Sequence, residues 1–342
     1  MYSWNKSLVF AVLLPLVAGP ALAAAADEVN LYSARKENLI KPLLDQFTDQ
    51  TGIKVNLVTG KAKALIKRLQ SEGRNTPADL LITVDAGNLH AAKKAGFFEA
   101  VDSDVLNKSV PANLRDNDGQ WFALSKRSRV IVHSKERVKA SELSTYEDLT
   151  DSKWKGRICI RSSGNIYNQS LLSSMIAHQG EEKAQAWAEG VVANMARAPK
   201  GNDRAQVKAV AVGVCDIAVV NTYYMGVMLD KGKDQKEAAG KVSVFFPNQD
   251  DRGAHINVSG AGVIAGAKNR DNAVKLLEFL VGDEAQKWYA QANHEYPVKA
   301  GIGVSDIVKA WGYPFKQDEL SVAELGRFNT DAVKVFDRAG WK

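Results

Sequence analysis

Short apolar runs alternate with stretches of helical periodicity along the first hundred residues of the chain. Residues 28–33 alternate between polar and apolar side chains, as a strand does, and residues 36–50 place Leu39, Leu43 and Phe47 on one helical face. The strands predicted here are 28–33, 53–58 and 77–85, and the helices are 36–50, 61–71 and 88–94. Strands separated by helices of about ten residues are typical of βαβ units, so the sequence predicts a mostly parallel sheet flanked by helices.

The pattern changes at residue 120, where two β-like runs, 121–125 and 129–133, follow each other without a helix between them. Such a passage suits a chain that crosses from one lobe to another, and the β-like run 256–265 is expected to cross back. The other predicted elements are strands near 157, 215 and 242–246 and helices at 169–177, 181–194, 203–212, 272–281, 284–292 and the C-terminus.

The predicted fold class is therefore α/β with two lobes, and a mature chain of more than 300 residues supports two cores better than one. We expect the first lobe to comprise residues 27–130 plus 256–300, and the second 131–255 plus 301–342. Hinged two-lobe proteins close around a ligand, and ligands of open α/β sheets bind beyond the carboxyl ends of the strands. The ligand cleft is accordingly expected between the lobes.

Residues 1–26 have the pattern of a secretory signal peptide: a basic start, an apolar run from Leu8 to Ala18, and small residues at A-x-A spacing. Cleavage is expected after Ala23 or Ala26. No later stretch reaches about 18 uninterrupted apolar residues, and no cysteine lies near the cleavage site. The sequence therefore predicts an exported, periplasmic protein without a membrane anchor.

The formal net charge of +6 becomes +5 once residues 1–26, which hold one lysine and no acid, are removed. This excess is small and is scattered over predicted helix faces, which favours a solvated surface over a nucleic-acid interface. Nucleic acid is therefore not expected as a partner.

Two cysteines, Cys159 and Cys215, occupy matching places in two predicted strands. In an oxidising compartment such a pair favours a disulfide, and two buried free thiols are the alternative. A catalytic thiol is disfavoured, because neither cysteine has a flanking histidine and both lie in apolar runs.

Three tyrosines follow predicted strands: Tyr167 after the first cysteine strand, and Tyr223 and Tyr224 after the second. A phenol has a pKa of about 10, so it is neutral at pH 7 unless a bound cation stabilises the phenolate. Hard trivalent cations prefer oxygen ligands, which makes Fe3+ the metal that such a cluster would bind best. The alternative is that all three are ordinary core or helix-cap aromatics.

Several short motifs together resemble the periplasmic ferric-iron-binding proteins of ABC-type importers, which have the class II periplasmic binding protein fold. The matching stretches are 31–35 (LYSAR), 77–80 (PADL), 125–130 (SKRSRV), 154–157 (WKGR), 161–168 (RSSGNIYN), 201–203 (GND), 221–224 (NTYY) and 293–297 (NHEYP). The resemblance implies that Tyr167, Tyr223 and Tyr224 hold Fe3+. It also implies a monomer without catalytic activity that delivers iron to an inner-membrane ABC permease.

The chain departs from several family members directly after the first motif, where Lys36 and Glu37 replace a His-Tyr pair of ligands. A subgroup without that pair completes the iron shell with carbonate or another small anion. The resemblance then implies that an anion is held by the residues Ser33, Arg35, Arg127 and Ser162. Two other readings remain open: the arginines could form surface ion pairs, and Glu37 could itself be a ligand.

Two rival functions are also compatible with the sequence. One is a binding protein for a small oxyanion or organic solute, in which the tyrosines stack or donate hydrogen bonds. The other is a secreted hydrolase built around Ser162 or Ser163, with His178 as a distant candidate base, although the G-x-S-x-G pattern is absent.

Overall fold

The structure is a computed structural model that describes residues 1, 27–230 and 233–342. The predicted signal peptide, apart from Met1, lies outside the described residues. None of the helices in the described part is long and apolar enough to cross a membrane.

The first lobe is built on three parallel strands, as the periodicity of residues 28–94 predicts. Strand β1 (Glu28–Ser33) lies between β2 (Lys54–Thr59) and β3 (Leu80–Val84) and pairs in parallel with both. Strand β8 (Ile256–Val263) then pairs antiparallel with β3. The helices of this part are α1 (Glu37–Thr51), α2 (Ala62–Glu72), α3 (Ala86–Lys94), α4 (Asp104–Ser109), α10 (Arg270–Leu280) and α11 (Asp283–Ala292).

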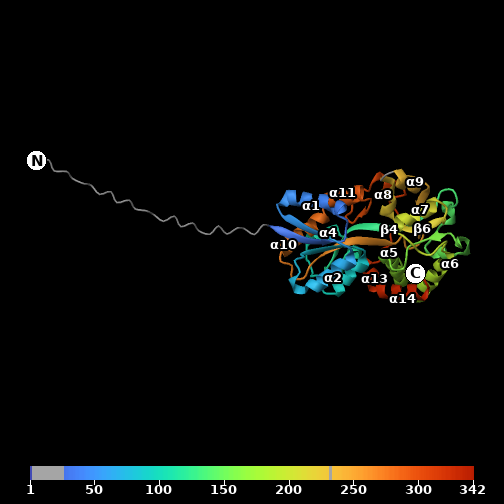
Figure 1. Ribbon diagram of the computed structural model, residues 1–342, viewed down its shortest axis with the longest axis horizontal. Helices are drawn as coiled ribbons and strands as arrows, with labels where there is room; N and C mark the ends of the chain where they lie inside the picture. The colour runs from blue at the N-terminus through green and yellow to red at the C-terminus, as the bar shows by residue number, and fades with distance from the viewer. Residues whose placement is uncertain (2–26, 231–232) are drawn as a thin grey trace.

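A single long strand, β4 (Phe122–Ser134), runs from one lobe into the other, and Figure 1 shows it passing between the two groups of helices. Its first half pairs with β8 and β9 (Tyr296–Pro297), and its second half pairs with β6 (Ile217–Asn221) and β7 (Val242–Phe245). The sequence predicts two strands here because the polar residues 126–128 interrupt the apolar pattern. The structure corrects this: those residues keep their pairing with β8, so β4 is one continuous strand.

The second lobe centres on β6 (Ile217–Asn221), which pairs antiparallel with β4 and in parallel with β5 (Ile158–Cys159). Strand β7 (Val242–Phe245) pairs antiparallel with β4. The helices of this part are α5 (Ile166–Gln179), α6 (Glu181–Asn194), α7 (Asp203–Ala211), α8 (Thr222–Asp230) and α9 (Lys233–Gly240). The C-terminal part adds α12 (Asp306–Lys309), α13 (Val322–Arg327) and α14 (Asn329–Arg338). Short 3-10 turns lie at Gly73–Asn75, Ala112–Leu114, Ala140–Glu142, Glu147–Thr150 and Ser152–Trp154.

Side-chain alternation along the second-lobe strands divides its interior into two cores. On β6, Ile217 and Val219 pack into one cluster with α5, α6 and α14, while Ala218 and Val220 pack into the other beneath α7 and α8. A strand buried on both faces has this pattern because successive side chains point to opposite sides. The first lobe has one large core of its own, to which α13 contributes Val322 and Leu325.

The predicted disulfide is confirmed: Cys159 and Cys215 are bonded, with their Cα atoms 5.8 Å apart. Cys159 lies in β5 and Cys215 just precedes β6, so the bond joins the two strands that lead into the tyrosine-bearing helices α5 and α8.

Replacing both cysteines with alanine is expected to lower the free energy of unfolding by about 2–4 kcal/mol, because the unfolded chain regains the entropy of a 56-residue separation. Denaturant unfolding of the protein purified without reductant measures this change. The reduced parent is the control, since it loses the bond and keeps both sulfur atoms. Unchanged stability of both forms would contradict a stabilising role for the bond.

Candidate metal centre

Each of the three tyrosines lies in the first turn of a helix. Tyr167 is the second residue of α5, and Tyr223 and Tyr224 are the second and third residues of α8, which follows β6 directly. The Oη of Tyr223 donates a hydrogen bond to the Oη of Tyr167 at 3.3 Å. The ring centroids of Tyr223 and Tyr224 are 4.3 Å apart. The structure thus brings together phenols that are 56 residues apart in sequence, and leaves all three partly exposed.

Helix α8 is seated tightly against the segment that contains β9. A Cβ added at Gly226, three residues after Tyr223, would lie 2.4 Å from the Cβ of His294. Only glycine allows this close approach. The position of α8 is therefore limited by contact with a segment that pairs with β4.

Arginines surround the phenols. The guanidinium carbons of Arg127 and Arg161 lie 5.5 Å and 5.6 Å from the ring centroid of Tyr167, and that of Arg204 lies 5.0 Å from the ring centroid of Tyr224. Guanidinium groups at these distances are attracted by the ring quadrupole. The cluster is therefore a set of phenol oxygens surrounded by positive charge.

Two of the phenols, those of Tyr223 and Tyr224, are held in their neutral form by their surroundings. Burial is the main cause that raises the pKa of Tyr223 well above its ordinary value, and the neighbouring Tyr167, Tyr224 and Asp203 raise it further. Burial likewise raises the pKa of Tyr224 to about 12. At pH 7 these groups lose their protons only to a ligand that brings strong positive charge, as a trivalent metal ion does.

The two arginines that the resemblance implies for anion binding are both buried, so neither is at the surface, but Arg35 does form an ion pair, a buried one with Glu295. Arg127 is 2 % exposed; its Nη1 donates to the Oγ of Ser259 at 2.9 Å, while its Nε and Nη2 have no hydrogen-bond partner among the residues that the structure describes. Arg35 is more fully engaged, because its Nη2 donates to Glu295 at 2.7 Å and its Nη1 to Ser125 at 3.2 Å. Buried N–H groups are seldom left unpaired, so Arg127 is the stronger candidate for an anion ligand.

The two predicted serines occupy different environments. Ser33 is buried at the end of β1, and its Oγ accepts a hydrogen bond from the backbone N–H of Arg35 at 3.2 Å. Ser162 is exposed, and its Oγ accepts from the backbone N–H of Gly164 at 3.2 Å. The structure places Ser33 next to Arg35, whereas Ser162 caps the turn that leads into α5.

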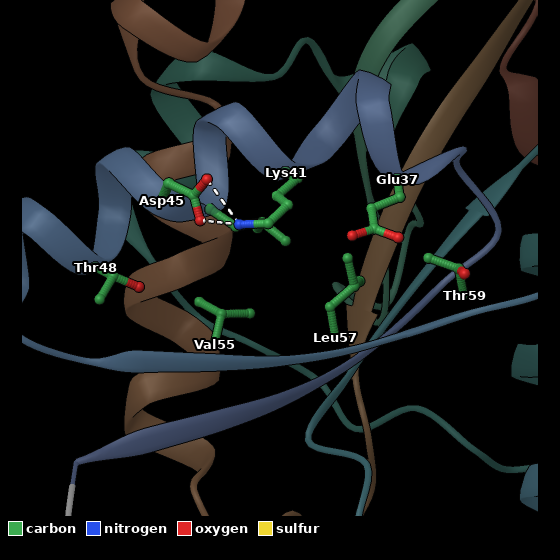
Figure 2. Close-up of a pocket in the computed structure, with 8 residues that line it drawn as sticks. Glu37, Lys41, Asp45, Thr48, Val55, Leu57 and Thr59 are labelled. Carbon is green, nitrogen blue, oxygen red and sulfur yellow. Dashed lines mark hydrogen bonds and ion pairs between the residues drawn. The ribbon is translucent and has the colours of Figure 1, made fainter.

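Glu37 lies away from the tyrosines. Figure 2 shows its exposed side chain in a pocket between α1 and β2, with Leu57 and Thr59 opposite and the Lys41–Asp45 ion pair further along the helix. None of the tyrosines lines this pocket. The geometry therefore gives no support to Glu37 as a ligand.

Sequence reasoning missed the charged residues that support the site: Arg161, Arg204, Asp203 and Glu295. Arg161, Asp203 and Glu295 lie inside motifs that carry the resemblance, but nothing in a single sequence distinguishes a buried charge from a surface one. His178, the candidate base of the hydrolase reading, pairs instead with Asp318 through its Nε2 at 2.9 Å. Within residues 1, 27–230 and 233–342, no group of three or more His, Cys, Asp or Glu side chains is placed to hold a metal.

Two lobes joined by β4, with a polar cluster at the ends of strands and helices between them, define a two-lobe solute-binding protein. Comparison with known proteins agrees: the family described as bacterial extracellular solute-binding protein matches residues 75–310. Iron uptake protein A1 of Synechocystis sp. is 51% identical over 317 residues, which cover 92% of this chain and 88% of the relative.

Two solved structures extend the comparison. Trichodesmium FutA (IdiA) in complex with iron and citrate ligands is 50% identical with a TM-score of 0.90, and the match covers 92% of this chain and 100% of that one. Apo FutA2 from Synechocystis is 44% identical with a TM-score of 0.88, over 93% of this chain and 100% of that one. The chain therefore belongs to the bacterial extracellular solute-binding family, within its group of periplasmic ferric-iron-binding and iron-uptake proteins, as the motifs predict.

Proposed function

We propose that this protein captures Fe3+ in the periplasm with Tyr167, Tyr223 and Tyr224 as phenolate ligands and delivers it to an inner-membrane ABC permease. The observation that carries the proposal is the convergence of the three phenols, with Tyr223 and Tyr167 Oη atoms 3.3 Å apart. Relatives described as iron uptake and ferric iron-binding proteins support it. Cleavage after Ala23 or Ala26 and action as an unanchored monomer belong to the same proposal.

Charge balance supports a small anion as an additional iron ligand. Three phenolates neutralise Fe3+, so a dianion such as carbonate leaves a net charge of minus two. Arg127 offsets one of these charges, and Arg35 approaches the anion while it also forms an ion pair with Glu295. The unpaired Nε and Nη2 of Arg127 are suited to a planar anion, because a guanidinium donates two parallel hydrogen bonds. A related protein binds iron together with citrate, which supports an oxygen-rich anion in this role.

The division of the ligands between the lobes suggests the order of events. All three tyrosines belong to second-lobe helices, Tyr167 to α5 and Tyr223 and Tyr224 to α8, whereas Arg35 follows β1 of the first lobe. The second lobe can therefore hold iron while the cleft is open, and the first lobe joins through the anion. Closure is favoured only by contacts that the loaded site makes in the closed form.

Addition of Fe3+ to the metal-free protein tests the proposal. Charge transfer from phenolate to Fe3+ is expected to produce a visible absorption band that saturates at one iron per chain. Spectra recorded with and without bicarbonate show whether the anion takes part. A binding protein for a small oxyanion or organic solute, or a hydrolase, would remain colourless and would contradict the proposal.

Arg35→Ala is expected to increase the rate of iron release by about tenfold when bicarbonate is present, because the first lobe loses its charged contact with the anion. The difference from the parent should shrink when bicarbonate is removed. Release to a competing chelator, followed by loss of the visible band, measures both rates. Arg68→Ala is the matched control. Arg35 lies over the ring of Tyr289 and Arg68 over that of Tyr32, but Arg68 forms its ion pair with Glu72 of its own helix, α2. Equal rates for Arg35→Ala and the parent at saturating bicarbonate would contradict the role of Arg35.

A further inference from the structure

One buried guanidinium connects the two elements that present the tyrosines. Arg129 lies in β4 and is 1 % exposed. Its Nη2 donates to the Oδ1 of Asn168 at 2.5 Å, and its Nη1 donates to the Oδ1 of Asn221 at 3.1 Å. Asn168 directly follows Tyr167, and Asn221 stands two residues before Tyr223. A single planar group thus spans the start of α5 and the end of β6.

The second member of this network is Asp203, the first residue of α7, which is fully buried. Its Oδ1 accepts from the Nη1 of Arg129 at 3.0 Å and from the backbone N–H of Asn221 at 3.0 Å. Its Oδ2 accepts from the Nη1 of Arg161 at 2.5 Å, and Arg161 in turn lies over the ring of Tyr167. The carboxylate therefore contacts the backbone that leads to Tyr223 and, through Arg161, the face of Tyr167.

Asn168 extends the network to the turn before α5. Its Nδ2 donates to the carbonyl oxygens of Arg161 and Ser162 at 2.8 Å and 3.2 Å. The side chain is buried, and both ends of its amide form hydrogen bonds: the Nδ2 group donates to the turn, and the Oδ1 atom accepts from Arg129. The position of Tyr167 is thus tied to β4 by side-chain hydrogen bonds in addition to the helix backbone.

The cost of burying this pair indicates a role beyond stability. Two charges removed from water lose hydration that their attraction only partly restores, so a buried ion pair is often no more stabilising than apolar side chains of the same size. What the pair does supply is direction, because a guanidinium donates in fixed directions within one plane. The Nη1 and Nη2 groups of Arg129 donate four hydrogen bonds. Three go to Asn168, Asn221 and Asp203, and the fourth goes to the carbonyl oxygen of Val219.

We infer that Arg129 and Asp203 are positioning residues for the tyrosine cluster, which hold Tyr167 and Tyr223 at ligand spacing before the metal arrives. The inference rests on the proposed function, since it assigns these residues a role in binding Fe3+. Binding to a site that is already ordered costs less conformational entropy, so loss of the network should appear as faster release of iron.

Arg129→Lys tests this inference, because lysine keeps the charge but cannot donate to Asn168, Asn221 and Asp203 in one plane. Asn168→Ala is the second variant; it cuts the link to α5 and leaves the Arg129–Asp203 pair in place. Both are expected to release iron about tenfold faster or more and to shift or broaden the visible band. The free energy of unfolding, measured in parallel, separates this effect from a general loss of stability.

Asp216→Asn is the matched control. Asp216 also accepts from two arginines, Arg137 and Arg157, each at 2.6 Å, but it stands at the opposite end of β6 from the tyrosines. We expect it to lower stability while leaving the release rate and the visible band as in the parent. The inference would be overturned if both Arg129→Lys and Asn168→Ala released iron at the parent's rate with the parent's spectrum. It would also be overturned if the release rate changed in proportion to the loss of unfolding free energy in all three variants. A parent that forms no coloured complex would instead overturn the proposed function.

Discussion

Tyr223→Phe is expected to weaken Fe3+ binding by more than the roughly 10–100-fold that loss of an outer-shell partner of a metal site costs. The substitution keeps the ring that packs against Tyr224 and removes only the oxygen that would bind the metal. It also removes the hydrogen bond to Tyr167, which is worth only about 1 kcal/mol to stability. Competition with a chelator measures the affinity, and denaturant unfolding shows that the fold is retained.

The control for this substitution is Tyr313→Phe. Tyr313 is also a partly exposed tyrosine, and it packs in a separate aromatic cluster with Tyr296 and Phe315. Its iron affinity should match that of the parent, while Tyr224→Phe should behave like Tyr223→Phe. Parent-like affinity in both Tyr223→Phe and Tyr224→Phe would show that the phenols are not the ligands.

Iron binding is expected to weaken steeply as the pH falls. The pKa of Tyr223 is raised well above its ordinary value and that of Tyr224 to about 12, so both phenols carry their protons at pH 7. Each phenol that becomes a ligand must then release one proton, and lower pH opposes that release. The affinity should fall about tenfold per pH unit for each proton that Fe3+ displaces, and so about a hundredfold per pH unit for Tyr223 and Tyr224 together.

Proton release measured in weakly buffered solution, with Fe3+ supplied as a fixed chelate, counts the phenols directly. The parent should release one proton more per iron than Tyr223→Phe, after correction for the chelate alone. Affinity that does not change between pH 6 and pH 8 would contradict phenolate ligation, because neutral phenols or an arginine-bound anion could hold their ligand without this loss.

The α/β elements of the fold could be predicted because their side-chain periodicity is strong, and helix α6 begins and ends where the sequence predicts. The continuity of β4 could not be predicted, because Lys126, Arg127 and Ser128 resemble a polar loop when their buried surroundings are unknown. The disulfide could be predicted because Cys159 and Cys215 occupy matching places in two short apolar runs. The approach of Tyr167 to Tyr223 could be predicted because each follows one of these runs, and neighbouring parallel strands end at the same edge of a sheet. Asp203 and Glu295 could not be assigned, because burial of a charge depends on partners that are distant in sequence.

The close contact between α8 and His294 restricts which residue can occupy position 226. A methyl group at position 226 would meet the Cβ of His294, the residue before the Glu295 carboxylate that accepts from Arg35. One added carbon would therefore displace the phenols of one lobe and the guanidinium of the other together. In a library of random codons screened for colour, position 226 should return glycine alone, while the half-buried neighbour Val227 should tolerate many residues.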